Sequence, residues 1–364
     1  TDKGNVIRNV PHLRFPEFEG EWEKCKFKDV CNISTGNKNT QDKADDGIYP
    51  FYVRSQTVER INSWTFDGEA ILTAGDGVGV GKVFHHSYGK IGVHQRVYIL
   101  SDFKCDANYL FHFFSSKFYN RVKRMSAKNS VDSVRKEMIT DMPLSLPCHK
   151  EQVQIGHMLS LLDERIATQS KIIEDLKKLK SAISKKLLCN DKWTTCIIQD
   201  IAEIGRGRVI SSVEIDRQKN PLYPVYSSQT SNNGIMGYLD NYMFDGEYIT
   251  WTTDGANAGT VFYRKGKFNC TNVCGTLKIQ SKFDCYFVSL VLQQATQKYV
   301  SSNLANPKLM NNTMASIKIR MPNIETQKQL SKVFQTLDSC LLVHQRTCKM
   351  YQSEKQYLLR QMLI

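Results

Sequence analysis

The sequence of 364 residues is long enough for two or more domains that each bury a core. It has no apolar run near the roughly 18 residues that a membrane helix needs, and its first residues lack a secretory signal pattern. We therefore expect a cytoplasmic protein with no membrane partner. Lysine and arginine number 49 against 36 acidic residues, a net charge of +13. This excess favours a polyanionic partner over a surface that is basic only for solubility.

The eleven cysteines lack the CxxC spacing of zinc sites and redox motifs, so we expect reduced thiols. The closest pair, Cys270 and Cys274, has no matching His or Cys pair after it, which favours buried packing over metal binding. The eight histidines show no metal or triad pattern.

Residues 20–145 are predicted to form one unit: short β-segments broken by turns come first, and a helix at 107–125 follows them. The segment 72–84, LTAGDGVGVGKVF, has the glycine content of a phosphate-binding loop. A Walker A loop needs G-x-x-x-x-G-K-[ST], but Asp76 stands at the first glycine and Val83 at the serine or threonine. The dinucleotide spacing G-x-G-x-x-G is also absent, so the segment predicts a tight turn between two strands.

From Pro147 onward, apolar residues recur in alternating steps of four and three. This heptad pattern predicts a helix whose apolar seam is about 33 residues long. Because proline suits a first helical turn, we expect the helix to begin at Pro147 and its repeat at Pro322.

The sequence contains an internal duplication. Residues 66–84 align without gaps on 244–262, with ten of 19 positions identical, and residues 146–188 align on 321–363 at a constant offset of 175. The helix at 107–125 has its counterpart at 285–300. Even the polar interruptions of the seam recur, Gln169 with His344 and Lys180 with Lys355.

A first helix that leaves unit one for unit two must be antiparallel to a second that returns. We therefore predict an α+β fold with two pseudo-two-fold-related units separated by two long antiparallel coiled-coil helices. The alternative is that each helix packs only on its own domain. The predicted segments are 1–146, 147–189, 190–321 and 322–364. The predicted seam residues are Ile155, Leu159, Leu162, Ile166, Ile173, Leu176, Leu330, Phe334, Leu337, Leu341, Tyr351 and Leu358.

No catalytic constellation, cofactor site or metal site emerges from the sequence. The residues between the matched blocks are divergent, polar and basic, and Arg, Lys, Asn and Gln are the side chains that read base edges and bind phosphates. The candidate DNA contacts are Arg54, Ser55, Gln56, Thr73, His94, Gln95, Arg96, Lys128, Asn129, Ser130, Ser228, Gln229, Thr230, Trp251, Thr253, Asn257, Thr271, Asn272, Asn306 and Lys308.

With this duplicated plan, the chain resembles the specificity subunit of bacterial type I restriction-modification enzymes over essentially its full length. The resemblance rests on PHLRFPEFEGEWE (11–23), on the YPFY…SQT and FDGE…GDG…GKV blocks, and on LPCHKEQVQIGHMLSLLDERI (146–166). The last is similar to the proline-Glu-Gln signature at the start of the family's conserved helices. In the second copy Thr326 separates Glu325 from Gln327, which puts the start of that helix in doubt.

The resemblance implies a non-catalytic subunit with two target recognition domains, each reading one half of a split double-stranded DNA target. It also implies partners: two methyltransferase subunits that bind S-adenosylmethionine, and ATP- and Mg-dependent nuclease and translocase subunits attached through them. The helices would set the spacer length, as a ruler. The alternatives are a duplicated scaffold without DNA specificity, or a stand-alone enzyme that uses a nucleotide or a methyl donor.

Overall fold

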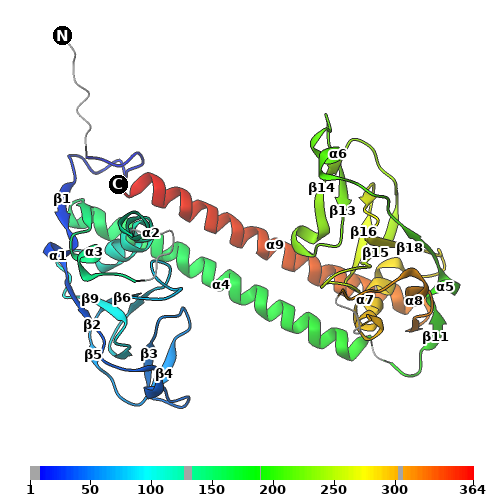
Figure 1. The fold of residues 1–364 in the computed structure, drawn as a ribbon, viewed down its shortest axis with the longest axis horizontal. Helices are drawn as coiled ribbons and strands as arrows, with labels where there is room; N and C mark the ends of the chain where they lie inside the picture. The colour runs from blue at the N-terminus through cyan, green and yellow to red at the C-terminus, as the bar shows by residue number, and fades with distance from the viewer. Residues whose placement is uncertain (1–8, 127–132, 189, 302–305) are drawn as a thin grey trace, which may run out of the picture. The chain divides into compact units, whose positions relative to one another are not determined.

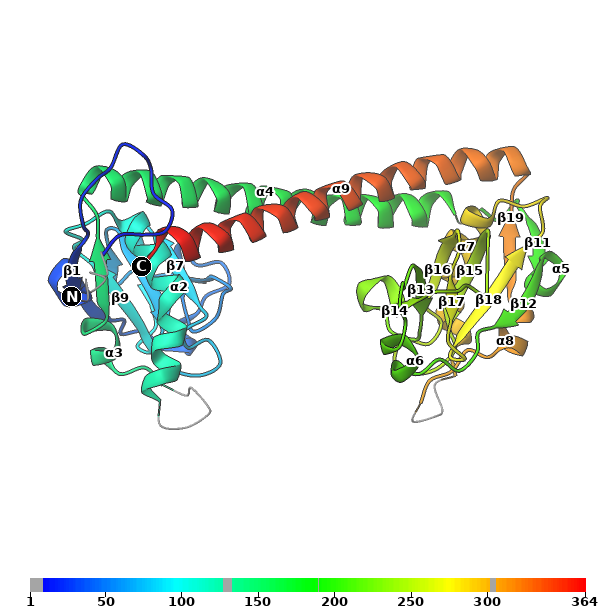
Figure 2. The ribbon, with the colours of Figure 1, turned by 90° about the horizontal axis from the view of Figure 1, so that it is seen from above.

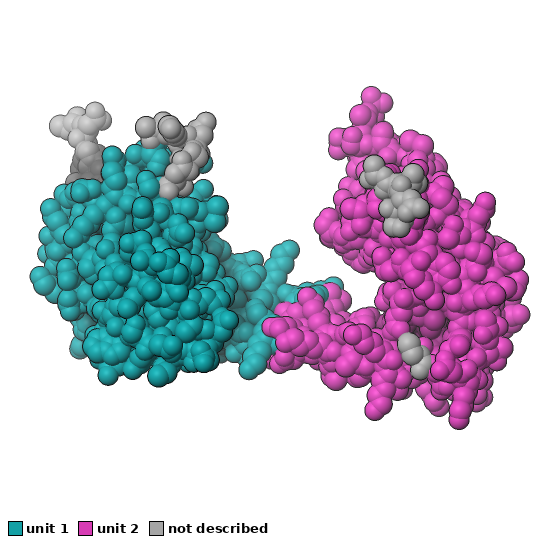
Figure 3. Space-filling view, turned by 60° about the horizontal axis from the view of Figure 1, so that its bottom comes forward, with its two compact units in different colours: residues 1–171, 345–364 teal, residues 172–344 magenta. Residues whose placement is uncertain are grey.

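The structure is a computed structural model that describes residues 9–126, 133–188, 190–301 and 306–364 (Figure 1). It divides into two compact units (Figure 3). Unit 1 comprises residues up to 171 together with 345–364, and unit 2 comprises residues 172–344. Each unit therefore includes part of both long helices, whereas the sequence analysis set the helices apart as segments of their own. The reason is that each helix end packs into the core of a unit.

Unit 1 contains two four-stranded sheets, in the orders β2-β9-β6-β7 and β4-β3-β8-β5, and a two-stranded sheet of β1 and β10. The strands are β1 (Glu23–Lys26), β2 (Asn32–Thr35), β3 (Tyr49–Tyr52), β4 (Glu59–Ile61), β5 (Phe66–Asp67), β6 (Ala70–Ala74), β7 (Phe84–Ser87), β8 (Lys90–Val93), β9 (Val97–Ser101) and β10 (Pro143–Leu146). The short helices are α1 (Phe27–Val30), η1 (Thr40–Asp42) and α3 (Lys136–Thr140).

Helix α2 (Ala107–Met125) has the bounds that the sequence predicted. Asp106 caps its first turn by accepting a hydrogen bond from the Tyr109 backbone N–H at 2.8 Å. Its buried face, including Phe114 and Phe118, packs into the main core of the unit. Figure 2 shows α2 beside the sheet that contains β7 and β9.

Unit 2 repeats this plan, with sheets β12-β18-β15-β16, β14-β13-β17 and β11-β19. Its strands are β11 (Thr194–Ile197), β12 (Ala202–Arg206), β13 (Tyr223–Tyr226), β14 (Ile235–Leu239), β15 (Glu247–Thr252), β16 (Val261–Lys265), β17 (Asn269–Cys270), β18 (Cys274–Ile279) and β19 (Lys318–Met321). Its shorter helices are α5 (Ile198–Ile201), α6 (Ser212–Asp216), η2 (Ser231–Gly234), α7 (Cys285–Ala295), η3 (Thr296–Tyr299) and α8 (Asn311–Ala315).

The strand orders show the duplication directly. β2, β9, β6 and β7 occupy the places of β12, β18, β15 and β16, and the parallel pair β3–β8 recurs as β13–β17. The other named strand pairs are antiparallel.

The long helices are α4 (His149–Leu187) and α9 (Ile324–Met362), and their first residues differ by the repeat offset of 175. Both begin two residues after the proline, so the expectation that Pro147 and Pro322 stand in the first turn is wrong. The prolines instead offer carbonyls to the helices. Gln152 Nε2 donates to Pro147 O at 2.9 Å and Gln327 Nε2 donates to Pro322 O at 2.8 Å.

The same glutamines connect each long helix to its unit. Gln152 Oε1 accepts from the backbone N–H of Asp106, and Gln327 Oε1 accepts from that of Asp284, both at 2.9 Å. Asp284 caps α7 as Asp106 caps α2. One glutamine thus bridges the start of a long helix and the cap of the unit's main helix, which explains why it recurs in both copies.

Thr326 does not shift the start of α9. Its counterpart Glu151 is fully buried and forms a bidentate ion pair with Arg14, with both N···O distances at 2.8 Å. Arg14 belongs to the N-terminal segment, where the Leu13 backbone N–H also donates to Gln361 O of α9 at 3.0 Å. Unit 2 has no copy of this segment in the sequence, so a glutamate at position 326 would lack this arginine.

Leu162-Asp163 recurs at the repeat offset as Leu337-Asp338, and the two aspartates form reciprocal ion pairs. In unit 1 Asp163 of α4 pairs with Lys355 of α9, and in unit 2 Asp338 of α9 pairs with Lys180 of α4. The two lysines are the recurring polar interruptions of the seam. Each therefore has a carboxylate on the opposite helix, an arrangement that favours one register.

The helices are antiparallel within unit 1, since Arg165 lies over the Tyr351 ring at 5.7 Å while Ser170 Oγ lies 3.8 Å from Cys348 Sγ. All of the predicted seam residues are buried or half-buried. Ile155 and Leu159 belong to the core of unit 1 and Phe334 to that of unit 2. The helices therefore pack both on the units and on one another, which corrects the choice between the two that the sequence left open.

His112 on α2 is 1% exposed. Its Nε2 lies 3.2 Å from Ser160 Oγ, and its Nδ1 lies 3.8 Å from the Asp163 carboxylate, which pairs with Lys355. Burial, assisted by Lys355 and by His86, lowers the pKa of His112 to about 3. The native state therefore holds a neutral imidazole.

Between pH 6.5 and about 3 the unfolded chain binds a proton at His112 that the native chain does not. We expect unit 1 to lose stability as the pH falls through this window, at up to about 1.4 kcal/mol per pH unit from this residue. His112→Gln, which keeps a partner for Ser160, should reduce that dependence. Urea unfolding of both proteins at pH 7 and pH 5 measures the difference. An equal loss of unfolding free energy between the two pH values in wild type and variant would contradict a neutral, buried His112.

Candidate nucleic-acid interface

Loops at one end of the unit 1 strands bring together candidates from distant parts of the sequence. Arg54 follows β3, Asp76 follows β6 and Arg96 precedes β9. Backbone hydrogen bonds join the loops: the Gly75 N–H donates to Arg96 O at 2.8 Å, and the Val134 N–H donates to Gly75 O at 2.7 Å. A cavity of about 340 Å³ opens between Thr40, Arg54 and Asp76.

Asp76 orients the two arginines. Its carboxylate accepts from Arg54 Nη1 at 2.8 Å and lies 3.3 Å from Arg96 Nη1. The arginine side chains are 45% and 63% exposed, and ion pairs this exposed contribute about 0–1 kcal/mol. Both guanidinium groups can therefore exchange the carboxylate for a phosphate or a base edge at small cost.

The turn between β6 and β7 was predicted, but it presents a side chain, Val78, that was absent from the sequence-based candidates. Gly77 and Gly81 have φ angles of 76° and 65°, and their counterparts Gly255 and Gly259 have 95° and 81°. This confirms the predicted tight turn. Val78 in this turn is 97% exposed and lines the cavity together with Arg54. The glycines on both sides of Val78 were the sequence signal that could have identified it as an exposed residue in a turn.

Unit 2 builds the equivalent cluster with different residues. Asp254, the copy of Asp76, lies 3.7 Å from Lys308 Nζ and accepts a 2.6 Å hydrogen bond from Thr253 Oγ1. The Thr253 N–H donates to Val273 O, and the Leu309 N–H donates to Thr253 O. The loops at 253–257, 270–273 and 306–309 are thus joined by backbone contacts.

A cationic or imidazole side chain supports the loop after the repeated tyrosine in each unit. In unit 1 the His85 ring lies tilted against the Tyr52 ring, with 4.9 Å between the ring centres, and its Nε2 lies 3.1 Å from Ser55 O. In unit 2 the buried Arg264 guanidinium lies 3.6 Å from the centre of the Tyr226 ring. Burial lowers the pKa of His85 and of Arg264. His85 thus holds the SQT loop of unit 1, and Arg264 holds the tyrosine that precedes the SQT loop of unit 2. Neither was among the sequence-based candidates.

Most candidates lie where a duplex can reach them. The exposed ones are Arg54, Ser55, Gln56, Gln95, Arg96, Thr230, Asn257, Asn272 and Asn306, and the half-buried ones are Ser228, Gln229 and Lys308. Lys128, Asn129 and Ser130 lie outside the described residues. Contact with DNA remains a prediction for each of these residues.

Five candidates are corrected by their burial: Thr73, His94, Trp251, Thr253 and Thr271 are 0–5% exposed. Thr73 Oγ1 donates to Val83 O between the two ends of the β6–β7 connection, and Trp251 Nε1 donates to Leu309 O. His94 Nδ1 accepts from the Arg96 N–H at 3.0 Å, and burial lowers the pKa of His94. These side chains support the loops and do not present a group to DNA.

The described cysteines are free thiols, and Cys270 and Cys274 are buried with their Sγ atoms 3.6 Å apart. This confirms the buried packing that the sequence favoured. Among the described residues no three His, Cys, Asp or Glu side chains are grouped as a metal site. None of the described helices has the length and apolar character to cross a membrane.

Comparison with known proteins identifies the family. The sequence profile of the type I restriction modification DNA specificity domain matches residues 19–178 and again residues 190–349. The chain belongs to this family. As a specificity subunit it is similar to the putative type I specificity subunit S.MpnORF201P of Mycoplasma pneumoniae, at 37% identity over 199 residues that cover 54% of this chain and 82% of the relative. The MpnII specificity subunit of the same organism is 42% identical over 146 residues, 40% of this chain and 43% of that protein.

The fold of the specificity subunit is also found in solved structures. The type I restriction-modification S subunit from M. genitalium matches with a TM-score of 0.79 over 98% of this chain and 99% of that chain, at 16% identity. A chain from a structural study of type I complex assembly matches with a TM-score of 0.52 over 96% and 98%, at 11% identity. Two domain matches and a shared fold confirm the duplicated α+β architecture.

Lys308 provides a test of the interface in unit 2. We expect Lys308→Ala to weaken DNA binding across sequences and to reduce the slope of log K against log salt by about 0.9 for one lost phosphate contact. Lys265→Ala is the matched control, because its side chain is 72% exposed on β16 and pairs with Glu247. Filter binding from 50 to 200 mM salt measures both slopes. Equal slopes for the two variants would remove Lys308 from the interface.

Proposed function

We propose that the chain is the DNA-recognition subunit of a type I complex and that each unit reads one half of a bipartite target. One observation supports this most: both units hold exposed or half-buried cationic and amide side chains on loops organised by the same repeated aspartate, Asp76 or Asp254. Arginine and lysine pair with guanine, and asparagine and glutamine pair with adenine. Two such clusters in one chain match an asymmetric, two-part DNA sequence.

The long helices are the proposed ruler and the proposed docking site for two methyltransferase subunits. The reciprocal pairs Asp163–Lys355 and Asp338–Lys180 fix the helix register in each unit. In this proposal the partners bind S-adenosylmethionine, ATP and Mg and perform the chemistry, while this chain supplies sequence specificity without a catalytic group of its own.

Mapping of methylated adenines in cells that carry this chain and its methyltransferase tests the proposal. The wild type should give one bipartite motif. Val78→Asn should change only the half-site read by unit 1, since an exposed valine suits a thymine methyl group, and a lost base contact costs about 1–3 kcal/mol. Asn257→Ala should change only the other half.

Two results would contradict this assignment. If both substitutions altered the same half-site, the units would not read separate halves. If the purified complex showed no salt-dependent DNA affinity, the duplicated scaffold would be the better reading.

A further inference from the structure

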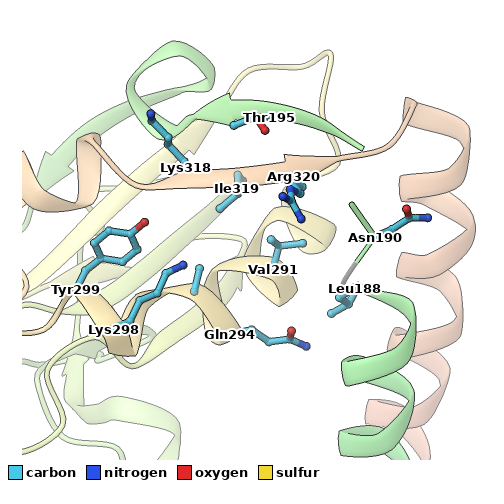
Figure 4. Close-up of a pocket in the computed structure, with 11 residues that line it drawn as sticks. Leu188, Asn190, Thr195, Val291, Gln294, Lys298, Tyr299, Lys318, Ile319 and Arg320 are labelled. Carbon is cyan, nitrogen blue, oxygen red and sulfur yellow. The ribbon is translucent and has the colours of Figure 1, made fainter. Parts of the chain in front are cut away.

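Each unit contains a cavity beside its two-stranded sheet, separate from the loops described above. In unit 2 the cavity has a volume of about 530 Å³ (Figure 4). Val291 of α7, Ile319 of β19 and Leu188 after α4 form apolar walls, and Lys298, Lys318 and Arg320 line it as well. We call it the unit 2 junction pocket.

Unit 1 has a cavity of about 420 Å³ in the equivalent place, the unit 1 junction pocket. It is lined by the cations Lys24, Lys117, Arg121 and Arg124 and by apolar residues that include Phe113 and Leu144. The two pockets are copies. Leu144 corresponds to Ile319 in the repeat and Phe113 of α2 corresponds to Val291 of α7, while Leu188 and Ile364 each lie within two residues of the end of a long helix.

Different residues provide the positive charge in the two pockets. Lys24 of β1 stands opposite Ser145 of β10, and in unit 2 Thr195 of β11 stands opposite Arg320 of β19. Directly opposite residues share one face of a sheet at about 5 Å. One point on the wall therefore carries a cation in both copies, although the cation has moved from one strand to the other.

These charges are largely uncompensated. No aspartate or glutamate occurs among the described residues that line either pocket. Lys117 donates to Leu363 O at 2.8 Å, and Arg121 donates to Met138 O and Asp141 O at 2.7 and 2.9 Å. These hydrogen-bond partners are neutral carbonyls, which orient the cations without cancelling their charge. The Asp141 carboxylate also acts on Arg121, but it is paired with Lys26 and Lys28 outside the lining. Arg320 has a carboxylate partner, Asp191, whose side chain is 90% exposed.

We propose that the junction pockets are two equivalent docking sites for an acidic segment of a partner protein, with an apolar side chain of that segment seated between the walls. One copy of the partner occupies each pocket. The identity of this partner as a methyltransferase subunit rests on the proposed function.

The mixed lining separates this occupant from DNA. A phosphate backbone has no apolar group to fill the space between Phe113, Met142 and Leu144 or between Val291 and Ile319. An acidic segment with a leucine or phenylalanine satisfies both parts of the lining, because its apolar side chain leaves water when it enters the space between the walls. The walls also include the residues that follow α4 and α9, so the pockets adjoin the helices on which docking is proposed.

The test measures the stoichiometry of the full chain with its purified methyltransferase by native mass spectrometry. The wild type should bind two copies. Lys298→Glu with Lys318→Glu should leave one copy bound, with affinity at the lost site reduced at least tenfold. Lys24→Glu with Arg124→Glu should do the same for the other pocket, and all four together should abolish binding. Lys219→Glu, at an exposed lysine of unit 2 away from the lining, is the matched control.

Each further outcome decides the proposal. DNA binding with an unchanged salt slope shows that the variants fold and that the pockets do not hold phosphates, as expected. Unchanged two-copy binding by the pocket variants, while Met350→Glu on the exposed face of α9 abolishes it, overturns the pockets and leaves the proposed function standing. If the pocket variants bind the partner normally but show a reduced slope of log K for DNA binding against log salt, the pockets bind DNA and not an acidic protein segment. Failure of the wild type to bind the methyltransferase overturns both proposals.

Discussion

A chain with four residues inserted into each long helix, after Lys171 and after His344, should recognise the same two half-sites with a spacer longer by about two base pairs. Four residues lengthen a helix by about 6 Å, and base pairs of a duplex are about 3.4 Å apart. Both insertion points lie inside continuous helices of 39 residues, at the division between the units. Neither insertion alters a reading loop, so the half-site sequences should stay the same.

Sequencing of methylated sites measures this result. The control carries the same four residues after Lys219, in an exposed turn of unit 2, and should keep the original spacer. An insertion in only one helix should impair assembly, because the reciprocal pairs of Asp163 and Asp338 then demand two different registers. A changed half-site or an unchanged spacer in the double insertion would refute the hypothesis that the long helices set the spacer length.

Phe334→Ala should have the largest effect on stability. The ring is fully buried in the core of unit 2, and removing a buried phenylalanine costs about 3–5 kcal/mol. That loss is comparable with the whole stability of a marginal domain, about 5–15 kcal/mol. We expect unit 2 to unfold at clearly lower urea concentration while unit 1 persists, and the variant complex to lose selectivity for one half-site.

Tryptophan fluorescence can follow the units separately in single-tryptophan variants, because Trp22 and Trp64 lie in unit 1 and Trp193 and Trp251 lie in unit 2. Val333→Ala is the matched control: it is adjacent on the same helix, 44% exposed, and should change the free energy of unfolding by less than about 0.5 kcal/mol. Leu159→Ala, at the repeat-equivalent position in α4, should destabilise unit 1 instead. Identical unfolding curves for Phe334→Ala and Val333→Ala would contradict the core assignment.

The amino-acid sequence determined the features that depend on neighbours along the chain. The heptad steps from Ile155 to Leu187 and from Leu330 to Met362 predicted both long helices, and the glycine spacing around Asp76 and Asp254 predicted the turns. Alignment of the chain with itself predicted two equivalent units. Such signals are local or repeat at a fixed period, so they can be read without knowing which residues meet in space.

Only the tertiary structure decided which polar residues are available to a ligand. Thr73 and Arg54 looked alike as candidates, but strand pairing turns Thr73 inward and leaves Arg54 on a loop. The partnership of Glu151 with Arg14 joins residues 137 positions apart. The shared charge of the junction pockets depends on strands β1 and β10 meeting in register. Burial and charge compensation arise from contacts between distant segments, and a single sequence does not record which distant segments meet.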